Sequence, residues 1–206
     1  MYDSAAYNSL PSLRSAASLV DDTVRAHLTG PVRKLFLECN AHEQYGIVLL
    51  HKHFAIADGE RLVEYRSSST AWKVGHEQTD IVAQYEGKIV PRSYRLYNGA
   101  AVPYEFGYYQ EAPRLNNTFQ TMALKVLKDL GLDQIFGLRC LDEYDPSLSI
   151  EVTEGKTNIM LVRGSVPEDE LIEAVWVFSV DDNDSCHCKE HCWPRKDGHV
   201  QDHSCG

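Results

Sequence analysis

The sequence predicts an α+β fold: a mostly antiparallel sheet, bent or partly closed into a barrel, with about three helices. About nine segments are rich in β-forming residues, and several of them are joined by short turns that contain glycine. Apolar residues recur at helical spacing in a few other stretches, one of which divides the strands into two blocks. We therefore expect one α+β domain over residues 1–180 and a small Cys/His-rich appendage over residues 181–206.

The helical spacing of apolar residues marks three segments. Ser12 and Thr118 are suitable N-caps for the first and the third of these segments. Gly30 and Gly131 stand where the same two segments end, as glycine commonly does after a helix. The expected helices cover residues 12–29, 31–38 and 118–130.

The strands are expected as hairpins that follow one another along the chain. Asn98-Gly99 and Gly155 are typical of tight turns between antiparallel strands, and Gly59 and Gly87 mark two further turns. This arrangement favours an antiparallel meander. The expected strands cover residues 45–56, 61–65, 79–85, 88–97, 100–109, 135–141, 148–154, 157–162 and 173–180.

The composition excludes several classes of protein. The 206 residues are 43% apolar and 24% charged, which is usual for a globular chain. With 20 Lys+Arg against 30 Asp+Glu, the net charge is −10. A general nucleic-acid binder or an anionic-membrane binder needs basic patches, so this balance argues against both. No apolar run approaches the roughly 18 residues of a transmembrane helix, and we expect no membrane contact.

The C-terminal segment holds most of the metal-ligand residues. Of the fifteen Cys and His residues in the chain, eight lie between Cys186 and Cys205. Zn²⁺ prefers four thiolate or imidazole ligands arranged as a tetrahedron, and closely spaced pairs can supply them from short loops. We predict a structural zinc site here, with disulfides or an unstructured tail as the alternatives. The first-choice ligands are Cys188, Cys192, His199 and His203, and the alternates are Cys186, His187, His191 and Cys205.

A second candidate site lies on the apolar segment 45–56. His51 and His53 alternate along the expected strand, so both imidazoles point to one face. A strand that is apolar on both faces is buried, and buried imidazoles need partners. The pair is therefore a hydrogen-bonded structural pair, an acid–base pair or a second metal site. Glu64, on the expected return strand, could orient either imidazole.

The His-x-His segment resembles in part the strand with which cupin-like barrels hold iron, manganese or zinc. In those barrels the motif is Gly…His-x-His…Glu; here Gly46 precedes His51 by five positions and Glu60 follows His53 by seven. The resemblance implies a metal at His51 and His53. It places the third ligand, Glu60, beyond the expected turn.

A wider resemblance links this segment to the tail. The stretch Leu49-Leu-His51-Lys-His53-Phe54, followed by Leu62-Val-Glu64-Tyr65, is similar to uncharacterised fungal proteins, several of which end in a Cys/His-rich tail. That resemblance implies that the strand and the tail belong together. It implies no activity.

One strand carries a row of aromatic residues. Tyr104, Phe106 and Tyr108 alternate within residues 100–109, so they share a face. Such a face can line an apolar ligand pocket with hydroxyl groups, or it can simply pack in the sheet.

These features favour an intracellular zinc-binding protein, cytoplasmic or nuclear, whose body binds a small molecule or a protein partner. The sequence contains no phosphate loop, nucleophile elbow or dinucleotide fingerprint. The alternative is an enzyme acting on a small organic substrate, with His51 or His53 as acid–base group or metal ligand and Glu64 orienting it. A third interpretation is a disulfide-stapled secreted effector, although the first residues carry no secretory pattern.

Overall fold

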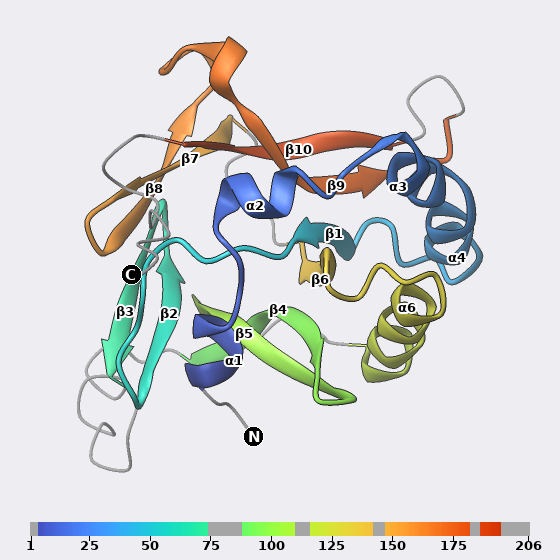
Figure 1. Cartoon of the computed structure of the whole chain (residues 1–206), viewed down its shortest axis with the longest axis horizontal. Helices are drawn as coiled ribbons and strands as arrows, with labels where there is room; N and C mark the ends of the chain where they lie inside the picture. Colours follow the sequence, from blue (N-terminus) through green and yellow to red (C-terminus); the bar gives the residue numbers. More distant parts are fainter. Residues whose placement is uncertain (1–3, 74–87, 110–115, 142–146, 182–185, 195–206) are drawn as a thin grey trace, which may run out of the picture.

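Ten strands close into one mixed barrel within the residues that the computed structural model describes, which are 4–73, 88–109, 116–141, 147–181 and 186–194. The order around the barrel is β1-β6-β4-β5-β2-β3-β8-β7-β10-β9 (Figure 1). The strands are β1 Tyr45–Leu49, β2 Glu60–Tyr65, β3 Ser68–Lys73, β4 Lys88–Tyr97, β5 Ala100–Tyr109, β6 Phe136–Cys140, β7 Leu148–Glu154, β8 Thr157–Val162, β9 Ile172–Phe178 and β10 Cys186–Trp193.

Two of the predicted hairpins are confirmed, because their turns are fixed by local sequence. The β4–β5 turn has Asn98 at φ 50° and Gly99 at φ 79°, the left-handed values that a type I′ turn requires. The β7–β8 turn has Gly155 at φ 58°. Most pairs in the barrel are antiparallel, as predicted, but β2 pairs with β5 and β7 pairs with β10 in parallel.

The hairpin expected between residues 45–56 and 61–65 does not form. Strand β1 ends at Leu49 and pairs with β6 and β9, whereas β2 pairs with β3 and β5. Strand β3 was not predicted, because its polar sequence Ser-Ser-Thr-Ala-Trp-Lys has no clear apolar alternation. The strand expected over 79–85 lies outside the described residues.

The helical segments are shorter and more numerous than the three predicted. The first expected helix is divided, because the Asp21 carboxylate accepts a hydrogen bond from the Val24 N–H at 2.8 Å and starts a new helix. The last is confirmed but begins one residue earlier, capped by Asn116 rather than Thr118. The segments are α1 Ser4–Asn8, α2 Leu13–Ala17, α3 Asp22–His27, a π-helical turn Leu28–Val32, α4 Arg33–Glu38, α6 Asn117–Asp129 and a 3₁₀ turn Glu168–Glu170.

The larger apolar core lies between the barrel wall and the helices. Helices α3, α4 and α6 gather on one side of the barrel, and the β2–β3 and β7–β8 hairpins lie on the other (Figure 1). Ile47 and Leu49 of β1 and Trp176 of β9 pack with Phe36 and Phe119 from the helices, and all five are at most 3% exposed. Burial of each such side chain contributes about 1.5–3 kcal/mol.

A smaller core uses the other face of β1. Val48 packs with Tyr7 and Leu10, which precede α2 in the chain. The strands approach closely here: a Cβ on Gly137 of β6 would lie 2.4 Å from the Tyr94 carbonyl oxygen. Glycine is therefore required at this position, and β1 is covered on both faces as predicted.

The described part of the expected C-terminal appendage is a strand of the barrel. Strand β10 pairs with β9 antiparallel and with β7 in parallel, so it completes the closure. Among the described helices, none is long and apolar enough to cross a membrane.

Candidate metal centre in the barrel

One part of the barrel interior is polar. A cavity of about 10 Å³, enough for about one water molecule, is surrounded by residues from seven strands, β2 to β8. Because seven strands contribute, this cavity lies inside the barrel. Its lining residues are Leu62, Glu64, Ser69, Arg92, Glu105, Phe106, Arg139, Glu151 and Asn158.

Arg139 of β6 is the centre of a buried charge network. Its Nη1 lies 3.1 Å from Glu105 Oε2, and its Nη2 lies 3.2 Å from Glu190 Oε2 and 3.5 Å from Glu64 Oε2. Arg92 forms a further ion pair with Glu64. Buried charges are tolerated only when they are paired in this way. Glu64, predicted to orient an imidazole, is therefore held by two guanidinium groups.

The two imidazoles lie side by side, although β1 ends at Leu49 and neither residue belongs to the strand that the prediction assumed. His51 and His53 are 4% and 2% exposed, and their ring centroids lie 4.6 Å apart. His53 Nε2 lies 3.6 Å from both Glu105 Oε1 and Glu151 Oε2. The carboxylates beside the pair are thus Glu105 and Glu151.

The surroundings of His53 and Glu105 favour an ion pair. Burial by itself lowers the pKa of His53, but Glu151 and Glu105 together raise it above its ordinary value. Burial raises the pKa of Glu105, but the His53 hydrogen bond and the Arg139 charge lower it to about 2. At neutral pH, Glu105 is therefore a carboxylate, placed between the Arg139 guanidinium and the His53 ring.

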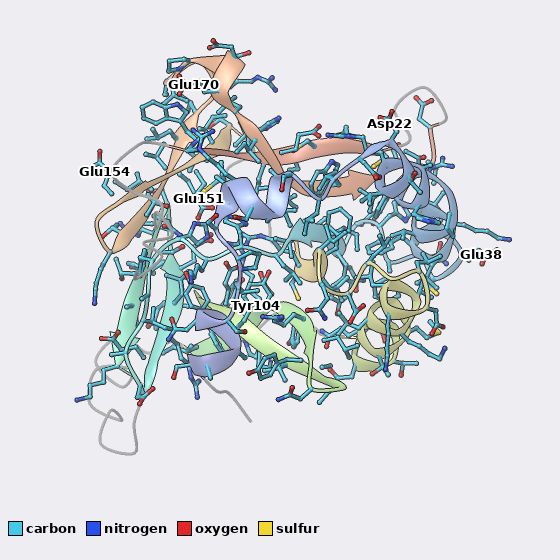
Figure 2. All side chains as sticks on the ribbon, viewed as in Figure 1. Asp22, Glu38, Tyr104, Glu151, Glu154 and Glu170 are labelled. Atoms are coloured by element: carbon cyan, nitrogen blue, oxygen red, sulfur yellow. The ribbon has the colours of Figure 1, made fainter. Side chains whose placement is uncertain are left out.

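His51 meets a thiol and a carboxylate in what we call the barrel cluster: His51, Glu151 and Cys192. Cys192 Sγ lies 3.5 Å from His51 Nε2 and 3.4 Å from Glu151 Oε2. One ligand atom of each residue lies within 4.8 Å of the others. In Figure 2, Glu151 lies among the strands, whereas Glu154 lies at the edge of the molecule.

The tautomer of His51 suits metal binding. Its Nδ1 lies 2.9 Å from the Leu49 carbonyl oxygen, so Nδ1 carries the proton and donates it. Nε2 is then the unprotonated nitrogen, and it is the atom beside Cys192. Burial, with the neighbouring His53, lowers the pKa of His51 to about 4, which keeps the imidazole neutral. A neutral imidazole with its other nitrogen tied to a carbonyl is the usual form of a metal ligand.

Cys192, unlike His51, is not in the protonation state that binds a metal. Burial raises the pKa of this thiol well above its ordinary value, and the nearby Glu151 carboxylate raises it further. The thiolate form therefore needs a nearby positive charge, which a bound cation would supply.

A second group, which we call the bulge cluster, consists of Glu173, Cys188 and His191. Cys188 Sγ lies 3.8 Å from His191 Nδ1, and one ligand atom of each of the three residues lies within 4.8 Å of the others. All three are partly exposed. Burial raises the pKa of Cys188 to about 12, and burial lowers the pKa of His191.

Three of the zinc ligands predicted in the tail belong to these clusters. The register of β10 against β9 shifts between Cys188 and Glu190 and again before His191, so a β-bulge separates Cys188 from Cys192. Cys188 and His191 join the bulge cluster, and Cys192 joins His51. Cys186 packs against the larger apolar core, and His187 is exposed. His199, His203 and Cys205 lie outside the described residues.

Of the predicted aromatic face, Phe106 lines the interior cavity. Tyr104 is buried in the smaller core, and Tyr108 makes ring contacts with Tyr65 and Trp72 at the barrel wall. The β4–β5 register shifts on both sides of the Ser93–Glu105 pair and skips Tyr104, which breaks the regular alternation that the prediction assumed.

Sequence reasoning missed most of the charge network. Glu105, Arg139 and Glu151 alternate with apolar residues in their strands, a pattern that indicates a solvent-facing polar row, and Glu190 lies in the polar stretch Lys-Glu-His. The one signal available was an arginine between apolar neighbours, in Phe-Gly-Leu-Arg139-Cys. The missed residues are Arg92, Glu105, Arg139, Glu151 and Glu190.

Comparisons with family models, with curated proteins and with solved structures found no match to this chain.

Replacing Glu105 with Gln tests the charge network. The Glu105→Gln variant leaves Arg139 and His53 without this carboxylate, and breaking such a buried pair costs about 3–5 kcal/mol of unfolding free energy. We expect a lower pKa for His53, measured by NMR titration of its ring protons. The stability difference from the parent chain should be largest at neutral pH. It should shrink as pH falls from about 4.5 to about 2, because the folded carboxyl is protonated only there.

The exposed Glu38→Gln variant is the control, because the Glu38–Lys34 pair lies at the surface. An unchanged pKa for His53, or equal stability losses in both variants, would contradict the network.

Proposed function

We propose that this protein binds zinc and that the barrel cluster of His51, Glu151 and Cys192 is its principal metal site. The observation that carries the proposal is the convergence of an imidazole nitrogen, a carboxylate oxygen and a thiol sulfur within 4.8 Å. These are the three donor types that zinc uses in proteins. They come from three separate segments: the residues after β1, strand β7 and strand β10.

The charge balance of the interior also supports a bound dication. The interior carries four carboxylates, those of Glu64, Glu105, Glu151 and Glu190, against the two guanidinium groups of Arg92 and Arg139. A bound dication would offset this excess of negative charge. Burial of charge is least costly when the buried set is neutral.

The thiols support a reducing compartment such as the cytoplasm. None of the five cysteines in the described part of the chain forms a disulfide. Reduced Cys and His residues that cluster in space are more often metal ligands than disulfide partners. In the alternative arrangement, Cys188, Cys192, His199 and His203 would hold the zinc with two thiolates and two imidazoles. It would compete with the barrel cluster for Cys192.

Metal analysis of the purified protein separates these two arrangements. We expect the His51→Gln variant and the Cys192→Ala variant to lose one equivalent of zinc, while a His199→Ala/His203→Ala double variant keeps it. His27→Ala and Cys39→Ser, whose side chains lie outside both clusters, are the matched controls. In the parent chain, a chelator should lower the thermal midpoint and added zinc should restore it, because the metal binds the folded state. The His51→Gln variant should not respond to the chelator.

The opposite pattern would contradict the proposal. If the double variant of the tail loses the zinc and His51→Gln retains it, the metal belongs to the tail. Parent protein that contains no zinc and is not stabilised by zinc would also reject a metal in the barrel.

A second candidate function is a zinc-dependent hydrolase acting on a small organic substrate. Three protein ligands leave a fourth position for water, and zinc lowers the pKa of such water to about 7. The interior cavity borders Glu151 and has room for about one water molecule. His53, 3.6 Å from Glu151, has a raised pKa and could donate a proton to a leaving group.

The His53→Gln variant tests this candidate with the metal in place. We expect it to retain zinc and to lose about 10²–10⁴-fold in kcat/KM toward chromogenic esters of small acids, the range for loss of a general acid. Zinc-loaded parent protein that is no faster than free zinc, or a variant with full activity, would reject the hydrolase.

A further inference from the structure

The bulge cluster has the composition of a second metal site, separate from the barrel cluster. Its residues are Glu173 of β9 and Cys188 and His191 of β10, none of which belongs to the barrel cluster. In a regular strand, residues three positions apart point to opposite faces. The register shifts between Cys188 and His191 remove that opposition, which is how a thiol and an imidazole from one strand come to face the same carboxylate.

The contacts within the cluster orient its ligands. Cys188 Sγ donates a hydrogen bond to the Glu190 carbonyl oxygen at 2.9 Å and lies 3.8 Å from His191 Nδ1. Glu173 also forms an ion pair with Arg25, whose Nη1 lies 2.6 Å from Glu173 Oε2. A carboxylate fixed by an outer partner is typical of a metal ligand, because that partner sets its direction.

The surroundings make this cluster accessible. Glu173 also borders an open groove of about 360 Å³. The groove is lined by Ala17, Val20, Arg25, Leu171, Ile172, Glu173 and Trp176. All three cluster residues are partly exposed, whereas His51 and Cys192 in the barrel cluster are buried. A metal at the bulge would therefore exchange with solvent much faster than one in the barrel.

From these observations we propose that Glu173, Cys188 and His191 bind a second, exchangeable zinc ion at the surface bulge of β10. One thiolate, one imidazole and one carboxylate favour zinc over the harder cations magnesium and calcium, which take oxygen ligands. Water would complete the four-coordinate site. The bound ion would join β10 to β9 at the place where their pairing is irregular.

The test counts zinc ions and their exchange rates in the full chain. A colorimetric chelator added to zinc-loaded parent protein should take up one zinc rapidly and one slowly. We expect a Cys188→Ser/His191→Ala variant to lack the rapid phase only, and His51→Gln to lack the slow phase only. The His199→Ala/His203→Ala variant should keep both phases. If the parent protein shows the rapid phase but no slow phase, the barrel site is rejected and the bulge site is supported.

Thiol protection gives a second readout that does not depend on metal counting. Zinc should slow the alkylation of Cys188, identified by mass spectrometry of the modified peptide, by at least about ten-fold, because a metal-bound thiolate is shielded from the reagent. His191→Ala should abolish that protection. Alkylation of Cys188 at the same rate with and without zinc would overturn the proposal, as would a rapid phase that survives in the Cys188→Ser/His191→Ala variant.

Discussion

The ion pairs of Arg139 are the interaction on which the interior of this barrel depends. One guanidinium from β6 contacts carboxylates from β2, β5 and β10, so it joins strands that are far apart in the sequence. The interior of a small barrel is filled by side chains. Here the interior carries charges, and each carboxylate in contact with Arg139 needs that guanidinium to offset the cost of leaving water.

This network also positions the proposed metal ligands. Glu105, held by Arg139 and by the Ser93 hydroxyl at 2.7 Å, faces His53. His53 faces Glu151, and Glu151 faces Cys192. The chain of contacts therefore runs from a structural ion pair to the thiol of the barrel cluster. Strand β10 supplies the Glu190 carboxylate to the Arg139 network and the Cys192 thiol to the barrel cluster. Both groups of contacts therefore require β10 to be paired in the barrel.

The local parts of the fold could be predicted from the sequence. The Asn98-Gly99 turn and helix α6 each depend on residues within one segment. The pairing of β1 could not be predicted in this way, because its partners β6 and β9 lie about ninety or more residues further along the chain. The choice of partner depends on closure of the whole barrel.

The sequence predicted the two ligand-bearing motifs but not how they come together, for a related reason. The alternation around Glu151 predicts a strand, but it indicates that the polar face is solvated, and a barrel with a charged interior reverses that expectation. The residues of β10 resemble a flexible ligand-bearing tail, because Cys-His-Cys-Lys-Glu-His-Cys-Trp has no apolar period. Only the bulge, which sequence does not reveal, separates Cys188 from Cys192. The two motifs noticed independently, the imidazole pair and the Cys/His segment, meet at His51 and Cys192.

X-ray absorption spectroscopy at the zinc edge of the purified protein tests the central claim most directly. Both the barrel cluster and the bulge cluster contain one cysteine, so the account predicts one sulfur neighbour per zinc at about 2.3 Å, with nitrogen and oxygen completing the shell. Two sulfur neighbours per zinc would contradict it and would indicate a site in which Cys188 and Cys192 bind the same ion.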